Sequence, residues 1–298
     1  MGFATQLVAG IAGIGAACFA YGTVVERRWY RVRHLTLPGV LRIPGTLRVL
    51  HLSDIHLVPR QAHRTAFIRS LTDFEYDLVA VTGDSLGDVG AEQPIVEALG
   101  SLTSSKVPGV MVLGSNDLFG PVIKSPLSYF TKPGRRTHGA RLDTQRLIDG
   151  LAGHGYVTLR NGTAVLATRT GTVAVGGIDD PHLATTVIPP APQVTPAGGN
   201  HALHLGLVHA PYTDALTTLV TAGHDVLLAG HTHGGQVRFP PVGALVGNCD
   251  LPLKQVRGVS QFGGRWLHVS VGLGHSKYAP FRFACRPEAT IITVTGNH

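Results

Sequence analysis

The sequence is poor in cysteine, in aromatic residues and in charge. Only three of its 298 residues are cysteines, and none forms a CxxC pair, so a disulfide framework is not expected. The small number of cysteines fits a reducing compartment. We expect the three cysteines to pack as small buried hydrophobic residues. Charged residues make up 14% of the chain while 38 residues are glycine, which favours many tight turns over long solvated helices.

Two further absences bear on organisation and partners. The chain has no internal repeat and no linker between independent domains. Its net charge is +7, yet no basic stretch is interleaved with aromatic residues, so no nucleic-acid partner is expected. One basic cluster directly follows an apolar segment, which favours anionic lipid instead; it contains Arg27, Arg28, Arg31, Arg33 and His34.

The N-terminal segment is apolar. No charged side chain occurs from Gly2 to Val25, and the 19 residues from Leu7 to Val25 match one bilayer span. Because the basic residues follow this segment, a retained single-pass anchor with a cytoplasmic catalytic domain is favoured over a cleaved signal peptide or a peripheral helix. We therefore expect an anchor and juxtamembrane segment at 1–34 and a catalytic domain at 35–298.

The rest of the chain alternates short apolar runs with segments of helical spacing. The runs in "LRVLHLSD", "YDLVAVTGD" and "GVMVLGSND" do not alternate, as is typical of buried strands. Further strands are expected at 164–168, 173–177, 203–208, 266–271 and 290–294, and helices at 61–74, 94–102, 143–154 and 213–221. This order predicts an α/β fold in which a second sheet packs on the first and helices lie outside.

Five segments place polar side chains where an apolar strand gives way to a loop, which is where open α/β sheets hold their sites. They are SDIH with Asp54 and His56, TGD with Asp84, GSND with Ser115, Asn116 and Asp117, VHAP with His209, and GHTHGG with His231 and His233.

These side chains suit divalent metal ions. Side chains two apart in an extended segment point the same way, so Asp54 and His56 are expected to hold one cation, and His231-x-His233 repeats that spacing. The two oxygens of Asp84 can bridge two cations. Carboxylate and imidazole ligands favour Mn, Fe or Zn, and two such ions can activate a bridging hydroxide and clamp a phosphoryl group.

The order D-x-H, G-D, G-[N-H], H, G-H-x-H resembles the calcineurin-like metallophosphoesterases. "GHTHGGQ" followed by "GLGHSKYAPFRFACRPE" is similar to the bacterial membrane-associated branch, some of whose members hydrolyse lipid-linked pyrophosphates. The resemblance covers about 48–294 and implies a four-layer α/β/β/α sandwich of two mixed sheets. It also implies two metal sites: Asp54, His56, Asp84 and His233 for the first, and Asp84, His209, His231 and a loop asparagine for the second.

The chain departs from the family at one loop. It reads Gly114-Ser115-Asn116-Asp117 where the family has Gly-Asn-His. Without a gap, Ser115 falls on the metal-binding asparagine and Asn116 on the histidine, where it can hydrogen-bond a phosphoryl oxygen but cannot donate a proton as a general acid. With a shift of one residue, Asn116 becomes the metal ligand and Asp117 lies near the leaving group.

The favoured hypothesis is a di-metal phosphohydrolase acting on phosphoester or pyrophosphate bonds, with a lipid-linked phosphate at the bacterial cell membrane as one candidate substrate. Ser115, Arg135 and Arg136 are the candidate substrate contacts, and the two arginines lie in a basic loop. A soluble nucleotide phosphodiesterase and a non-catalytic metal-binding scaffold are the alternatives. The sequence leaves the substrate, the metal and the oligomeric state open.

Overall fold

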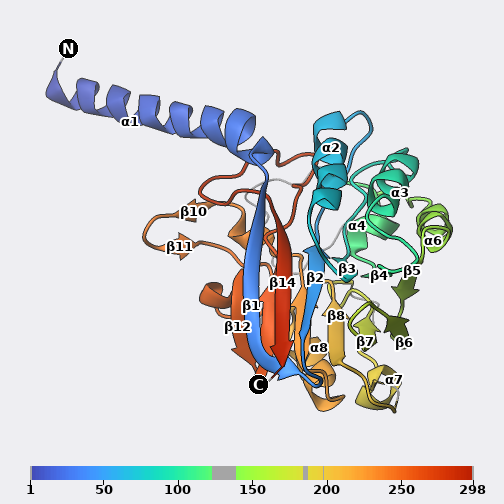
Figure 1. Ribbon diagram of the computed structural model, residues 1–298. Coiled ribbons are helices and arrows are strands. Elements are labelled where there is room, and N and C mark those ends of the chain that lie inside the picture. The colour runs from blue at the N-terminus through green and yellow to red at the C-terminus, as the bar shows by residue number, and fades with distance from the viewer. Residues whose placement is uncertain (1, 123–138, 184–186, 197, 297–298) are drawn as a thin grey trace.

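The computed structural model describes residues 2–122, 139–183, 187–196 and 198–296 (Figure 1). Two six-stranded mixed sheets form its body. In spatial order the first contains β1 (Arg31–Leu41), β14 (Glu288–Gly296), β2 (Thr46–Leu52), β3 (Leu78–Thr82), β4 (Gly109–Val112) and β5 (Tyr156–Leu159). The second contains β12 (Gly258–Phe262), β13 (Arg265–Val269), β9 (Val226–Ala229), β8 (Leu203–Val208), β7 (Thr172–Ile178) and β6 (Gly162–Ala167).

Helices cover the outer face of each sheet. The first sheet is covered by α2 (Ala62–Ser70), α3 (Glu92–Gly100) and α6 (Thr144–Ala152), and the second by α7 (Ala191–Val194) and α8 (Thr213–Thr221). The remaining elements are α1 (Phe3–Ala20), α4 (Ser115–Leu118), the hairpin of β10 (Arg238–Phe239) and β11 (Gly243–Ala244), and single turns at Tyr21–Val25, Glu26–Arg28, Leu71–Asp73, His233–Gly235 and Leu253–Gln255.

Three apolar layers separate these four layers of structure. Because successive side chains of a strand point to opposite faces, each central strand contributes to two layers. In β2, Leu50 and Leu52 face the helices while Leu47 and Val49 face the other sheet. The other central strands alternate in the same way. The predicted α/β/β/α sandwich of two mixed sheets is confirmed.

Strands β2, β3, β4 and β5 run parallel, as do β7, β8, β9 and β13. The carboxyl ends of neighbouring parallel strands therefore meet at one edge of each sheet. The expected helix over 213–221 coincides with α8, and the one over 143–154 matches α6, where the Asp143 side chain caps the helix by accepting from the Arg146 backbone N–H.

Strand β1 was not among the expected strands. It is an edge strand that is mostly half-buried or exposed, so its basic residues hide the apolar alternation that would have marked it. Arg31 Nε donates to Glu288 Oε2 on β14 at 2.7 Å. The expected boundary between residues 34 and 35 falls inside this strand, and the division into 1–34 and 35–298 stays a prediction.

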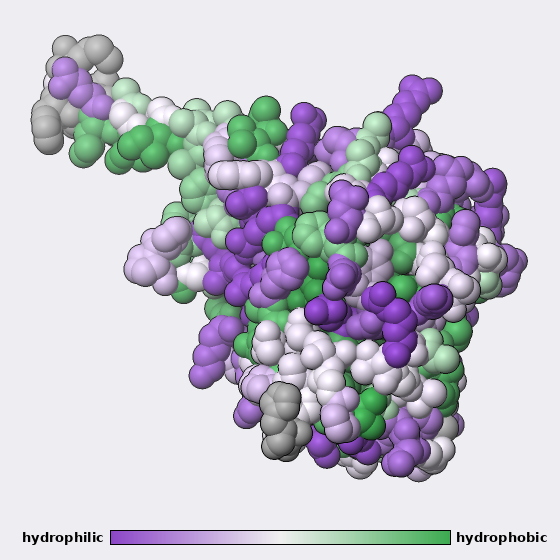
Figure 2. All heavy atoms as spheres, viewed as in Figure 1, coloured by the Kyte–Doolittle hydropathy of each residue, from purple (hydrophilic) through white to green (hydrophobic). Residues whose placement is uncertain are grey.

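Helix α1 projects from the body (Figure 1), and hydrophobic residues line it (Figure 2). Together with the turns that follow, it forms a helical segment over Gln6–Arg28 that is long and apolar enough to cross a membrane. Only 6% of the apolar stretch of this segment is buried inside the protein, so it is not a core helix. A signal sequence near the N-terminus meets the same criteria of length and composition.

Candidate metal centre

The two sheets bring the five predicted segments together at the carboxyl ends of their parallel strands. Asp54 and His56 follow β2, Asp84 follows β3, and α4 follows β4. From the second sheet, His209 follows β8, and His231 with His233 follows β9. Both oxygens of Asp54 accept from the backbone N–H of His231, at 3.1 and 2.9 Å, and so join the two sheets at this point.

Six of the seven predicted ligands form two groups. The first contains Asp54, His56 and His233, and the second contains Asp84, His209 and His231. Within each group the ligand atoms lie within 4.8 Å of one another. His56 Nε2 is 3.2 Å from His233 Nε2, and His231 Nδ1 is 3.3 Å from His209 Nε2. Each group therefore aims two imidazoles and one carboxylate at a common point.

Asp84 lies between the two groups. Its Oδ2 atom is 3.5 Å from His56 Nε2 in the first group and 3.3 Å from His209 Nε2 in the second. One carboxylate oxygen thus faces both groups, which is the placement that a bridging ligand requires.

Five of these residues have left-handed backbone conformations. The φ angles are 48° for Asp54, 43° for His56, 55° for Asp84, 68° for His231 and 49° for His233. Such values are uncommon outside glycine, and each costs on the order of 1–3 kcal/mol. Such strained conformations persist only where the surrounding structure holds them in place. Their concentration at the predicted ligands is typical of a functional site.

This geometry corrects one expectation from the spacing. His231 and His233 are left-handed rather than extended, and their side chains do not meet at one point. They serve different groups, as the resemblance to the family implied and the extended spacing did not. Asp54 and His56 are left-handed as well, so the extended backbone expected there is also absent, although these two side chains do fall in one group.

The charges of the site fit divalent cations. Asp54 and Asp84 are buried, and within the described residues all their ion-pair partners are histidines. Burial raises the pKa of Asp54 to about 6. Burial also opposes ionisation of Asp84, but the charge and hydrogen bond of His209 outweigh it and hold the pKa of Asp84 well below its usual value.

The imidazoles differ in their own electrostatics. Burial lowers the pKa of His56 to about 4 and that of His233 well below its usual value, so both are neutral and able to coordinate a metal. Burial disfavours the charged form of His209 too, yet Asp84 and Asp180 raise its pKa well above the usual range. A positive charge is thus favoured where these carboxylates converge, and the donor set fits Mn, Fe or Zn.

The altered loop forms α4, and its three residues have different surroundings. Asn116 Nδ2 lies 2.7 Å from Asp84 Oδ2, the oxygen that faces both groups, and the Asn116 backbone N–H donates to Asp84 Oδ1 at 2.8 Å. The two ends of an amide have nearly the same shape, so the Asn116 oxygen can occupy the same place after a half-turn. The backbone N–H of Ser115 donates to Asp180 Oδ2 at 2.8 Å.

Asp117, expected near the leaving group under one alignment, is fully buried and points into the backbone. Its two oxygens accept from four backbone N–H groups at 2.7–3.0 Å. The donors are Asp84, Ser85, Leu86 and Gly114. With both oxygens occupied, the Asp117 carboxylate braces the loop that carries Asp84.

Sequence reasoning missed four residues around the centre. Asp180 and His182 follow β7, and the His182 ring lies 4.2 Å from that of His231. Asp180 carried the same signal as the predicted ligands, because it is a polar residue after a buried strand.

The other two, Arg64 and Arg282, are buried arginines. Arg64 donates to the backbone carbonyls of Ile55 and His56. Arg282 donates to backbone carbonyls of the loop after β13, and its Nη2 atom lies 3.3 Å from His233 Nδ1. The two arginines carried no sequence signal, because most of their partners are backbone carbonyls.

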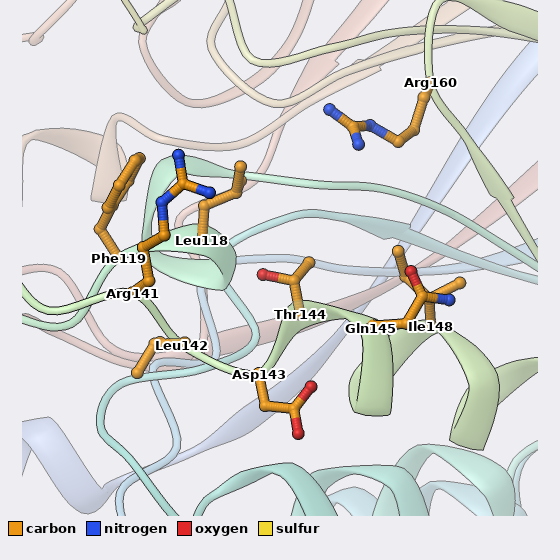
Figure 3. A pocket seen from close by; sticks show the side chains of 9 residues that line it. All are labelled: Leu118, Phe119, Arg141, Leu142, Asp143, Thr144, Gln145, Ile148 and Arg160. Atoms are coloured by element: carbon orange, nitrogen blue, oxygen red, sulfur yellow. The ribbon is translucent and has the colours of Figure 1, made fainter.

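A cavity of about 340 Å³ lies beside α4. Figure 3 shows the side chains of Arg141 and Arg160 on different sides of it, with Leu118 and Phe119 beside Arg141. The sequence prediction had instead chosen Arg135 and Arg136 as substrate contacts, and both lie outside the described residues.

Comparison with known proteins agrees with this site. Residues 47–235 match the sequence profile of the calcineurin-like phosphoesterase family. The chain is 29% identical to the metallophosphoesterase YkoQ of Bacillus subtilis, with 82% of each chain covered. It is 33% identical to the phosphodiesterase YaeI of Escherichia coli over 46% of this chain and 47% of that one. A hypothetical protein from Thermus thermophilus of known structure gives a TM-score of 0.44 at 15% identity, covering 78% of this chain and 79% of the other.

The fold and the site together define a metal-dependent phosphoesterase. The chain belongs to the calcineurin-like phosphoesterase family, since the matched residues span more than half of it and include all six grouped ligands. Family membership confirms the hydrolase activity that the sequence predicted.

Proposed function

We propose that the chain hydrolyses phosphodiester or phosphoanhydride bonds with two divalent ions of the Mn, Fe or Zn type. Asp54, His56 and His233 would hold one ion, His209 and His231 the other, and Asp84 would serve both. The observation that carries this proposal is the single Asp84 oxygen that lies 3.5 and 3.3 Å from imidazoles of the two groups. Ions bound there supply an acidified water for attack on phosphorus and neutralise charge on the phosphoryl oxygens.

Asn116 would complete the second site or hold a phosphoryl oxygen. Its amide reaches the shared Asp84 oxygen, whereas Ser115 contacts Asp180 through its backbone, so we favour Asn116 over Ser115 for either role. An amide cannot protonate a leaving group, and loss of a general acid typically costs about 10²–10⁴-fold in rate. We therefore expect substrates whose leaving group needs little protonation, such as pyrophosphates and aryl diesters. The relative YaeI, a phosphodiesterase, supports the diester class.

We further propose that the Gln6–Arg28 segment anchors the chain in the membrane and that the catalytic domain lies on the cytoplasmic side. Its length, its apolar surface and the basic residues at its carboxyl end support this arrangement. The substrate would then be a phosphorylated lipid or a small phosphorylated molecule near the membrane.

The test uses the purified full-length chain in detergent, stripped of metal and reloaded with Mn²⁺, Fe²⁺ or Zn²⁺. Hydrolysis of bis-p-nitrophenyl phosphate and p-nitrophenyl phosphate is measured beside bound metal per chain. We expect metal-dependent turnover that favours the diester, and a loss of at least about 10³-fold in Asp84→Ala, since both ions lose a ligand. Asp214→Asn, at an exposed position on α8, is the matched carboxylate control and should retain full activity.

Two results would contradict the proposal. Bound metal without turnover on either ester would favour a non-catalytic metal-binding protein. Full activity of Asp84→Ala would place the chemistry elsewhere in the molecule.

A further inference from the structure

The hairpin of β10 and β11 exposes an apolar surface with no catalytic residue on it. Phe239 is 52% exposed, Val242 74%, Leu245 54% and Val246 39%. No charged side chain occurs between Arg238 and Asp250. A protein surface that faces only water seldom carries a patch of large apolar side chains, so the hairpin is expected to contact a partner. We call residues 238–246 the apolar hairpin.

The base of the apolar hairpin is joined to the end of the Gln6–Arg28 segment. The Arg238 backbone N–H donates to the Phe283 carbonyl at 2.9 Å, and Val237 forms a parallel bridge with Phe283. The Phe283 ring in turn lies 6.3 Å from that of Tyr21. The hairpin and the candidate anchor thus both contact Phe283. Both project from the same side of the body (Figure 1).

The residues around Phe283 make further contacts with the Gln6–Arg28 segment. Phe19 stacks on Phe281 with ring centroids 5.4 Å apart, and the Arg282 backbone N–H donates to the Gly22 carbonyl at 3.2 Å. The buried Glu26 carboxylate accepts from the backbone N–H groups of Ala284 and Cys285. These contacts fix the direction of the segment relative to the hairpin.

The end of the segment carries the side chains that favour a lipid–water interface. Trp29 is 51% exposed, and the guanidinium of Arg286 lies 3.9 Å from its ring centre. Arg28 beside it is exposed as well. Interfacial aromatic rings and basic residues next to an apolar segment are typical of proteins that contact anionic lipid.

The apolar hairpin is also continuous with the metal centre. It follows the ligands His231 and His233 directly in the chain, and Arg238 Nη1 donates to the Gly234 carbonyl at 2.9 Å. A molecule held at the hairpin is therefore held next to the ligand loop of β9.

We propose that the apolar hairpin enters the lipid–water interface beside the anchor, so that the metal centre receives substrate from the bilayer. Its occupant is the acyl region of the membrane. The substrate class that follows is a lipid whose phosphodiester or pyrophosphate lies at the headgroup level, and this part of the inference rests on the proposed function.

The first experiment measures depth and needs no turnover. The full-length chain is reconstituted in vesicles of phosphatidylcholine and phosphatidylglycerol with brominated acyl chains, and tryptophan quenching is compared for Val242→Trp and Val165→Trp after subtraction of the wild-type signal. Val165 is exposed on β6, on the side of the body away from α1 (Figure 1). We expect strong quenching only at position 242. Equal, weak quenching at both positions would overturn the proposal.

The second experiment separates lipid from soluble substrate. Phe239→Ser, Val242→Ser and Leu245→Ser are combined, and Val89→Ser, Val157→Ser and Val165→Ser form a matched triple of exposed valines elsewhere. For CDP-diacylglycerol in vesicles we expect kcat/KM of the hairpin triple to fall at least about 10-fold, as lost burial of three apolar side chains implies. Turnover of bis-p-nitrophenyl phosphate should stay within about two-fold, because the ligands are untouched.

The outcomes separate this inference from the proposed function. Equal loss on both substrates, or no loss on either, would overturn the hairpin's role. A change of oligomeric state in the hairpin triple would assign the surface to a second copy of the chain instead. If neither substrate is turned over by the wild-type chain, the proposed function fails while the quenching result still decides whether the hairpin enters the bilayer.

Discussion

Gly230 shows how closely single residues constrain the metal centre. It lies between β9 and His231, and an added Cβ would collide with Ser53 Oγ and crowd Asp54 Oδ2. Ser53 Oγ donates to that same Asp54 oxygen at 2.6 Å. The absence of a side chain at Gly230 is therefore what allows Asp54 to reach its place from the other sheet.

We predict that Gly230→Ala keeps the fold but displaces Asp54. A displacement of about 1 Å can cost about 10²-fold in rate, so kcat/KM for bis-p-nitrophenyl phosphate should fall by at least that factor. Gly162→Ala on β6 is the control, since its added Cβ meets only an ordinary contact. Activity near wild-type in Gly230→Ala would show that Asp54 is not positioned as described.

At the scale of elements, α2 supports the loop that follows β2. Arg64 is buried on this helix and donates through Nη1 to the carbonyls of Ile55 at 2.6 Å and His56 at 2.8 Å. Both carbonyls therefore face the helix, and His56 itself has a left-handed backbone. One arginine thus holds the loop that presents two of the candidate metal ligands, Asp54 and His56.

We predict that Arg64→Met weakens metal binding by about 10–100-fold, the range found when groups that orient metal ligands are lost. Two buried carbonyls would lose their donor, and the loop would relax away from its strained conformation. Metal affinity is measured by competition with a chelator. Arg69→Met, on the same helix but exposed and paired with Glu97 at the surface, should bind metal as the wild-type chain does. Equal affinity of the two variants would rule out this role of Arg64.

At the scale of the whole molecule, buried neutral histidines link stability to pH. Burial lowers the pKa of His224 to about 4 and that of His268 to about 3. Both titrate near 6.5 when unfolded, so below that pH the unfolded chain binds more protons than the folded chain. Their contribution to stability is complete above about pH 6.5 and is lost as the pH falls toward the folded values.

We predict that the free energy of unfolding falls between about pH 6.5 and pH 4.5, by up to about 1.4 kcal/mol per pH unit for each such histidine. Urea unfolding of the full-length chain in detergent measures the slope. His224→Gln removes one titrating group and should flatten it, whereas His34→Gln, at an exposed position, should not. An unchanged slope in His224→Gln would mean that His224 is not buried and neutral.

Much of the fold and of the site was predictable because it depends on local pattern. Strands such as β3 are buried on both faces, so they read as unbroken apolar runs, and their ends were marked by Gly83 and Asp84. Strand β1 was not predicted, because it is an edge strand half-exposed to water and carries Arg31 and Arg33 in place of apolar residues. The helix α8 was predicted to the residue, since apolar spacing and its flanking loops agree.

The sequence by itself determined which residues are the candidate ligands, since carboxylates and imidazoles after buried strands can be recognised one segment at a time. The resemblance to the family already implied how these residues divide between two sites, whereas only the tertiary structure decided how the altered loop is directed. It turns Asp117 into the backbone and brings Asn116 to the shared Asp84 oxygen. The physical reason is that these directions depend on hydrogen bonds between the loops that follow β3 and β4, and such contacts are not encoded in the spacing of a single segment.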